Sequence, residues 1–301
     1  MSQVAERERL YGLLGRLPSR SRPISAQLLE EQEYDSFVLE KLVLDLNGIE
    51  PVPAYYLRAK QASDKAPVML YNHAHGGKYE IGKEEILHGR GALQSPPYGE
   101  VLTALGISVL CFDSWAFGER NGRSESDIFK EMLWNGQVMW GMMVYDSLRA
   151  VDYVTSRADV DPARIGTMGI SMGSTMAWWL AALDTRIRLV VDMCCMTDFQ
   201  ELLKEQNVRK HGLYYYVPDL LHHFTTSQIN ALIAPRPHLC TAGIHDPLTP
   251  AAGLDKIDAE MKRVYAGYGE PGAWSLLRYD AGHAETEEMR ESIIEFVRQR
   301  L

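Results

Sequence analysis

Hydrophobic and polar positions follow two different patterns along the chain. Phe37 to Leu46 alternates between apolar and polar residues, and Ile49 to Leu57 is rich in residues that favour strands. The two runs are separated by Asn47 and Gly48, a pair typical of hairpin turns. The pattern therefore predicts that the fold opens with an antiparallel hairpin.

From residue 68 onward, short apolar runs alternate with helix-like segments. The runs have the length and composition of buried strands and occupy residues 68–72, 109–113, 165–170, 189–195, 238–243 and 275–279. Helices are predicted over residues 99–105, 132–156, 172–183, 227–233 and 286–300. This alternation predicts an α/β fold with a mostly parallel sheet and helices on both of its faces.

Two segments fall outside this alternation. We expect residues 1–33 to form a peripheral helical segment, in which Ser25 caps a helix over residues 26–30. This segment is expected to cover part of the sheet or to form a contact within a homo-oligomer. Residues 196–223 are long for a connection, and we expect a lid-like insertion over the carboxyl ends of the strands, where open α/β sheets bind ligands. Residues 1–301 then form a single domain.

Composition and charge exclude several classes of protein. The chain has 46% hydrophobic and 24% charged residues, as is typical of globular proteins, and a net charge of -9 without a basic cluster argues against a nucleic-acid partner. No apolar stretch is long enough to span a membrane, and the first residues lack the apolar core of a secretory signal. We therefore expect a cytoplasmic protein, with buried and reduced thiols at Cys111, Cys194, Cys195 and Cys240.

The predicted strand over residues 165–170 leads directly into a helix through the pattern Gly169-x-Ser171-x-Gly173. This pattern is the nucleophile elbow, in which a serine occupies a strained turn and flanking glycines leave room for the backbone. Ser171 is therefore the predicted catalytic nucleophile. Because a serine hydroxyl is a weak nucleophile near neutral pH, it needs a base and a third group that orients the base.

Candidates for both partners follow later strands, in the order acid and then histidine that this arrangement requires. Asp246 follows the run over residues 238–243, and His283 follows the run over residues 275–279. Since the carboxyl ends of parallel strands meet at one edge of a sheet, we expect both side chains to lie near Ser171. The rival acids and the rival base are Asp219, Asp280 and His245.

Backbone amides are expected to stabilise the oxyanion of the tetrahedral intermediate. Met172 supplies one amide, because it begins the helix after the nucleophile. The second comes from the loop after residues 68–72, where Ala74 and His75 are equal candidates. No metal site is predicted in this loop, since His73-x-His75 is accompanied by no further ligands. The residues expected to line the substrate pocket are Trp115, Phe117, Tyr214, Tyr215 and Tyr216, with a small aromatic core as the alternative for the tyrosines.

Taken together, these motifs resemble those of the α/β-hydrolase superfamily. The resemblance rests on residues 73–77, 113–120, 169–173, 243–246 and 282–283, and is most similar to dienelactone hydrolase-like and acetyl-xylan-esterase-like proteins. Dienelactone hydrolases carry a cysteine nucleophile, so the serine at position 171 favours the serine esterases.

The resemblance implies an α/β-hydrolase fold and cofactor-free hydrolysis of a small-molecule ester through an acyl-enzyme. The aromatic residues of the insertion indicate a compact pocket, and hence short acyl groups such as acetyl. Two alternatives remain open. One is a peptidase, amidase or lactonase with the same three residues, and the other is a non-catalytic binding protein on this scaffold.

Overall fold

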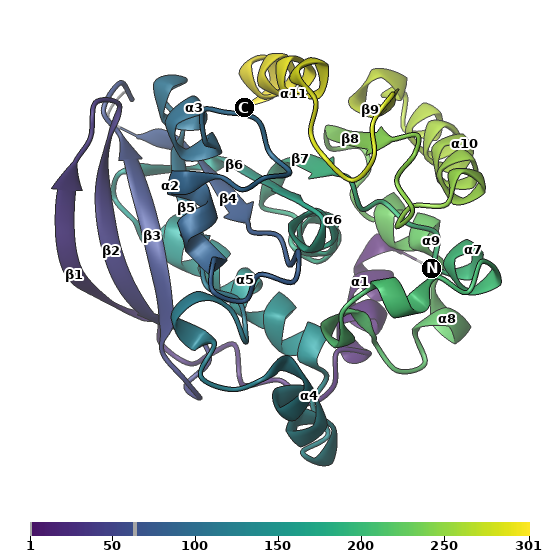
Figure 1. Cartoon of the computed structure of the whole chain (residues 1–301), viewed down its shortest axis with the longest axis horizontal. Helices are drawn as coiled ribbons and strands as arrows, with labels where there is room; N and C mark the ends of the chain where they lie inside the picture. The colour runs from purple at the N-terminus through teal and green to yellow at the C-terminus, as the bar shows by residue number, and fades with distance from the viewer. Residues whose placement is uncertain (1, 63–64) are drawn as a thin grey trace.

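A nine-stranded sheet runs through the computed structural model, which describes residues 2–62 and 65–301 (Figure 1). The strand order is β1-β2-β3-β5-β4-β6-β7-β8-β9. The pairs β1–β2, β2–β3 and β3–β5 are antiparallel, and the remaining neighbours are parallel. The prediction of a mostly parallel sheet with helices on both faces is confirmed.

The strands are β1 Ser25–Glu33, β2 Phe37–Asp45, β3 Val52–Ala59, β4 Ala66–Asn72, β5 Ser108–Phe112, β6 Val160–Ile170, β7 Ile187–Met193, β8 His238–Gly243 and β9 Trp274–Tyr279. The α-helices are α1 Gln3–Gly12, α2 Glu85–His88, α3 Tyr98–Ala104, α4 Glu125–Trp134, α5 Met139–Ser156, α6 Met172–Leu183, α7 Phe199–Lys204, α8 Leu220–His223, α9 Thr226–Ala231, α10 Ala251–Gly267 and α11 Glu287–Arg300. None of these helices has both the length and the apolar character needed to cross a membrane.

The predicted antiparallel hairpin is present as β2 and β3, which pair from Phe37 opposite Ala59 to Leu44 opposite Val52. Its connection is longer than a two-residue turn. Asn47 is buried in this connection, and its side-chain amide donates a hydrogen bond of 2.8 Å to Asp146 of α5. The bond ties the hairpin to the helical layer beneath it.

The prediction of a helical segment over residues 1–33 is wrong for its second half. Gln3–Gly12 is helix α1, but Ser25–Glu33 is the edge strand β1, so Ser25 begins a strand and caps no helix. All nine residues of β1 are exposed, so burial of side chains does not explain the strand. Its backbone pairs with β2 along almost its full length, and this pairing overrides the local preference of the sequence for helix.

Two helices differ from their predictions. The predicted helix over residues 132–156 is split into α4 and α5 by the four residues 135–138. Helix α10 was not predicted, although it carries a helical repeat of buried residues at Leu254, Ile257, Met261 and Tyr265.

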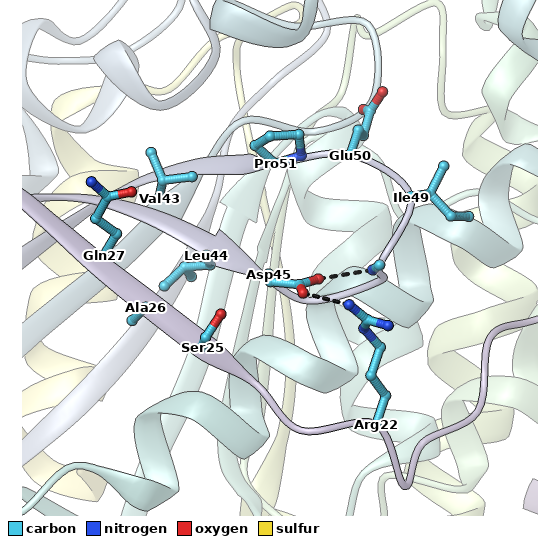
Figure 2. Close-up of a pocket in the computed structure, with 11 residues that line it drawn as sticks. Arg22, Ser25, Ala26, Gln27, Val43, Leu44, Asp45, Ile49, Glu50 and Pro51 are labelled. Atoms are coloured by element: carbon cyan, nitrogen blue, oxygen red, sulfur yellow. Dashed lines mark hydrogen bonds and ion pairs between the residues drawn. The ribbon is translucent and has the colours of Figure 1, made fainter.

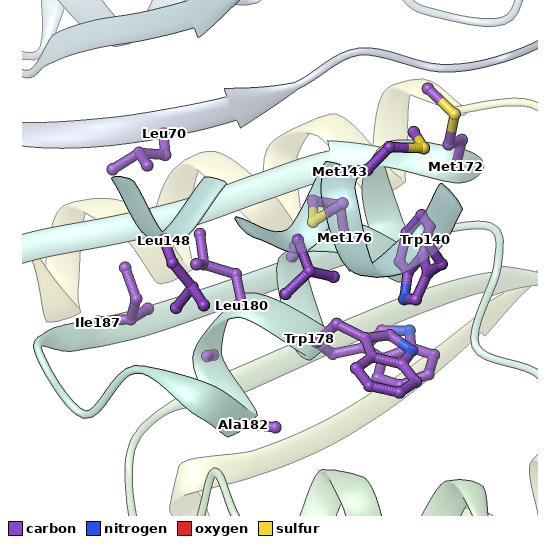
Figure 3. Close-up of a cluster of buried hydrophobic side chains, with 14 of the residues drawn as sticks. Leu70, Trp140, Met143, Leu148, Met172, Met176, Trp178, Leu180, Ala182 and Ile187 are labelled. Carbon is purple, nitrogen blue, oxygen red and sulfur yellow. The ribbon is translucent and has the colours of Figure 1, made fainter. Parts of the chain in front are cut away.

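Side chains of the central strands alternate between two hydrophobic layers. Val68 and Leu70 of β4 pack into the layer that contains α1, α5, α6, α9 and α10. Met69 and Tyr71 pack into the opposite layer, with α2, α3 and α11. In the first layer, large side chains of α5 and α6 pack together, and Figure 3 shows Trp140, Met176 and Trp178 in this cluster. The ring of Trp179 lies between the two other indoles, 6.2 Å from Trp140 and 5.8 Å from Trp178. All four cysteines are free and buried, as predicted.

The segment over residues 196–223 consists of short helices joined by turns. It contains α7, 3₁₀ turns at Val208–Lys210 and Leu213–Tyr215, and α8. The segment follows β7. Its turn Leu213–Tyr215 packs against α4 and α5, whereas α7 packs against α10 (Figure 1).

Candidate active site

Ser171 lies between β6 and α6 with φ 60° and ψ -119°, a backbone region that residues other than glycine rarely adopt. Its amide donates a hydrogen bond of 2.9 Å to the carbonyl of Met193, which holds the turn against β7. A Cβ at Gly173 would lie 1.8 Å from the Asn72 carbonyl oxygen, and one at Gly169 would lie 2.4 Å from the same atom. The turn therefore has the strained geometry of a nucleophile elbow and requires both glycines.

His283 and Asp246 form a hydrogen-bonded pair at the ends of the last two strands. The distance from His283 Nδ1 to Asp246 Oδ2 is 2.7 Å, and the Asp246 side chain is fully buried. The other carboxylate oxygen accepts a hydrogen bond of 2.9 Å from the Leu248 amide. A carboxylate only accepts hydrogen bonds, so it fixes the proton on Nδ1 and leaves Nε2 free to accept a proton.

Ser171 and His283 line one cavity of about 380 Å³. No hydrogen bond joins the two side chains among the described residues, and such catalytic bonds often tighten only when substrate binds. The other residues that line the cavity come mainly from the loop after β4 and from the insertion: His75, Gly76, Gly77, Lys210, His211, Gly212, Tyr214 and Leu248.

The rival acids and the rival base form hydrogen bonds away from Ser171. Asp280 is bonded to His245 at 2.8 Å, and the side chains of both are mostly exposed. Asp219 is bonded to His223 of α8 at 2.9 Å. None of the rivals lines the cavity that contains Ser171.

Of the two candidates for the second oxyanion donor, Ala74 is excluded by its hydrogen bonds. Its amide donates to the carboxylate of Glu85 at 3.1 Å and 3.3 Å, and its carbonyl accepts from Arg90 at 3.2 Å. The His75 amide donates to no other residue in the described part of the chain, and His75 lines the cavity. Met172 begins α6, so its amide has no partner within the helix.

The two histidines of this loop have structural hydrogen bonds at both ring nitrogens. His73 donates from Nδ1 to the Ala74 carbonyl and accepts at Nε2 from the Ser114 amide at 3.1 Å. Burial lowers the pKa of His73 to about 4, so the ring is neutral. His75 accepts at Nδ1 from the Gly77 amide at 3.0 Å, so the proton on Nε2 points to Glu125, 3.3 Å away. Within residues 2–62 and 65–301, no group of three or more potential metal ligands is found.

Of the five aromatic residues expected to line the pocket, the structure places one, Tyr214, at the cavity that contains Ser171. Trp115 and Phe117 are buried and do not line the cavity. Of the three tyrosines only Tyr214 lines it, whereas Tyr215 and Tyr216 line a neighbouring apolar pocket. Tyr215 also packs its ring against Phe199 and His211, as in the alternative of a small aromatic core.

Two carboxylates that the sequence did not single out hold the loop after β4. Glu85 binds the backbone of Ala74, and Glu125 binds the ring of His75. Neither belongs to a motif, because each acts on a residue that is distant in sequence. Only the fold brings these pairs together.

A separate cavity of about 450 Å³ lies beside β1 and the connection between β2 and β3 (Figure 2). Arg22 and Asp45 form an ion pair of 2.6 Å at its edge, and Asp45 also accepts a hydrogen bond from the Gly48 amide. Its lining includes Ser25 but no histidine that could act as a base. This cavity therefore lacks the groups that nucleophilic catalysis requires.

Comparison with known proteins identifies relatives along the whole chain. The sequence is 50% identical over 297 residues to "Putative hydrolase YtaP" of Bacillus subtilis (strain 168), and the match covers 99% of each chain. The chain belongs to the YtaP family. In addition, the family model of acetyl xylan esterase (AXE1) matches residues 116–228, a stretch that contains the nucleophile elbow.

Solved structures share the fold of this YtaP relative. A glucuronoyl esterase from Solibacter usitatus superposes with a TM-score of 0.71 at 17% identity and covers 97% of this chain and 91% of its own. An acetyl xylan esterase from Paenibacillus sp. R4 superposes with a TM-score of 0.66 at 18% identity, with coverage of 99% and 94%. These neighbours confirm the α/β-hydrolase fold that the sequence resemblance implied.

Proposed function

We propose that the protein is a serine hydrolase that cleaves small carboxylic esters through an acyl-enzyme on Ser171. The proposal depends on one observation: a single cavity contains Ser171 in a strained turn and His283, whose Nδ1 is bonded to the buried Asp246. Nucleophile, base and orienting acid are arranged in this way in serine hydrolases. The match to the acetyl xylan esterase family and the esterase neighbours of the same fold favour an ester as the substrate.

In the proposed reaction, His283 Nε2 accepts the proton of the Ser171 hydroxyl as its oxygen attacks the ester carbonyl. Asp246 holds His283 in the required tautomer and stabilises the imidazolium that forms. When the tetrahedral intermediate collapses, His283 returns the proton to the leaving alcohol. Water then attacks the acyl-enzyme with the same assistance, which releases the acid and restores Ser171.

The oxyanion of the intermediate is stabilised in this scheme by two amides. Met172 donates from the amino-terminal end of α6, where the helix dipole favours negative charge. His75 donates from the loop after β4, whose neighbouring residue Ala74 is fixed by Glu85 and Arg90. Donors held rigidly before the reaction lower the barrier because they need no reorganisation.

The size of the cavity favours small substrates. At about 380 Å³, it is close to the lower limit of roughly 300 Å³ for ligand pockets. We therefore propose short acyl groups of the acetyl type.

The proposal is tested by the hydrolysis of p-nitrophenyl acetate, butyrate and octanoate. Ser171→Ala is expected to lower kcat at least about a thousandfold. Ser156→Ala is the matched control, since Ser156 lies at the end of α5 and its hydroxyl donates to the backbone carbonyl of Tyr153 in the same helix. Equal activity of the wild type and Ser171→Ala would refute the mechanism, and faster cleavage of aminoacyl p-nitroanilides than of esters would favour a peptidase.

A further inference from the structure

The Glu125 carboxylate joins three separate segments at the wall of the catalytic cavity. It lies at the start of α4, is 7% exposed, and accepts hydrogen bonds from the His75 ring, the Tyr79 hydroxyl and the Tyr214 amide. His75 and Tyr79 belong to the loop after β4, whereas Tyr214 belongs to the insertion. Glu125 thus fastens the loop that bears the proposed oxyanion donor to the segment above it.

The surroundings of Glu125 stabilise its ionised form. Burial by itself would raise the pKa of Glu125, but the hydrogen bonds from His75, Tyr79 and Tyr214 outweigh burial and lower it. Position at the first turn of a helix of ten residues favours a negative charge as well. Three donors from two segments, the loop after β4 and the insertion, therefore converge on an ionised group.

A second cavity lies on the other side of this cluster. Its volume is about 500 Å³, and it is lined by Tyr79, Leu213 and the segment over residues 121–126, which includes Glu125. The catalytic cavity is lined on its side by His75 and Tyr214. Ring centroids of His75 and Tyr79 are 5.0 Å apart, and those of His75 and Tyr214 are 5.3 Å apart. His75 faces the catalytic cavity and Tyr79 faces the second cavity, so the wall between them is about two side chains thick.

We propose that Glu125 is a positioning residue that determines substrate length by holding this wall closed. The inference rests on the proposed ester hydrolysis at Ser171. With the hydrogen bonds intact, a chain that extends from the reacting carbonyl toward His75 ends at the wall. When they are broken, the ring of His75 is released, the two cavities join, and the longer chain enters the space lined by Tyr79 and Leu213.

The substitution Glu125→Gln breaks the wall with almost no change in shape. The Gln oxygen still accepts from the Tyr214 amide, so its NH₂ group faces the Nε2–H of His75, and two donors then oppose each other. Tyr79→Phe is a milder second variant, because it removes one hydrogen bond and keeps the ring that packs on Phe117. Glu131→Gln is the matched control on the same helix, because among the described residues its carboxylate pairs only with the exposed Arg123.

The assay compares kcat/KM for p-nitrophenyl octanoate and acetate, which differ in the acyl group, and for octyl and ethyl acetate, which differ in the alcohol. Two newly buried methylene groups correspond to roughly a tenfold gain. Glu125→Gln is therefore expected to raise the ratio of kcat/KM for the long ester to kcat/KM for the short ester about tenfold, in either the acyl or the alcohol series. The gain should come from a lower KM for the long ester. Tyr79→Phe should raise this ratio less, and Glu131→Gln should leave it within twofold.

Calorimetric binding of octanoate and acetate gives a second measurement that needs no catalysis. Glu125→Gln is expected to bind octanoate about tenfold more tightly relative to acetate than the wild type does. Unchanged ratios in both ester series and in binding would overturn the proposal, as would an equal loss of activity toward all substrates. An inactive wild type would refute the proposed function alone, and the binding ratios would then decide the role of Glu125.

Discussion

The substitution Asp246→Asn tests whether the proposed acid controls the tautomer of the base. Asp246 accepts two hydrogen bonds, from the Leu248 amide at one oxygen and from His283 Nδ1 at the other. Asparagine has one oxygen, and the Leu248 amide requires it because a backbone N–H only donates. The new NH₂ group must then face His283, which becomes an acceptor at Nδ1 and carries its proton on Nε2. That tautomer cannot take a proton from Ser171.

The expected magnitude follows from the burial of this contact. The Asp246 side chain is fully buried and lies 2.7 Å from the ring, so water cannot replace the lost acceptor. In serine proteases the corresponding change lowers kcat about ten-thousandfold, which corresponds to about 5 kcal/mol of transition-state stabilisation. We expect a loss of at least about a thousandfold here, and little change in melting temperature because the two side chains have almost the same shape.

The assay is kcat/KM for p-nitrophenyl acetate with Asp246→Asn and Asp280→Asn in parallel. Asp280 is a suitable control because it also pairs with a histidine, His245, but at the exposed surface. Its substitution should change kcat/KM by less than twofold. The reasoning fails if Asp246→Asn keeps more than a tenth of the wild-type activity, or if Asp280→Asn is equally damaging.

Two further predictions concern stability. Gly173→Ala should destabilise the fold by about 3 kcal/mol or more, because its Cβ would lie 1.8 Å from the Asn72 carbonyl oxygen. The control Gly12→Ala, whose Cβ would have no atom within 4 Å, should change the free energy of unfolding by no more than about 1 kcal/mol. Similar urea midpoints for the two variants would contradict the steric argument. Burial lowers the pKa of His73 from 6.5 to about 4, so the unfolded chain takes up a proton on this ring at a higher pH than the folded chain does. About 3 kcal/mol of stability that is present above pH 6.5 is therefore lost as the pH falls toward 4. Urea unfolding at pH 7 and pH 4.5 should show a smaller loss for His73→Asn than for the wild type, and an equal loss would refute this assignment.

The parts of the site that could be predicted from sequence are those set by local pattern and chain order. The elbow at Ser171 is a short motif, and the loops of Asp246 and His283 follow buried strands that can be recognised by their apolar runs. Parallel strands bring their carboxyl ends to one edge, so chain order alone brings these residues together. Their catalytic roles, the cytoplasmic location and assembly into homo-oligomers stay predictions.

The remaining features depend on contacts between distant segments. Ala74 and His75 cannot be distinguished by sequence, because the difference between them is the hydrogen bond from Ala74 to Glu85. Trp115 follows a strand like a pocket residue, yet Arg120 lies over its ring at 4.4 Å and helps to bury it. The strand β1 has a sequence that favours helix, and only its pairing with β2 determines its conformation.

The place of His283 in the sheet has a consequence for the working temperature of the protein. Ser171 follows the central strand β6, but His283 follows β9, the edge strand, which pairs only with β8. Beyond Trp274, the residues of β9 are partly buried or exposed. Edge elements open locally at a lower free-energy cost than the whole domain. Heating would therefore separate the proposed base from an intact nucleophile elbow. Catalytic activity would then be lost at a temperature at which most of the core is still folded.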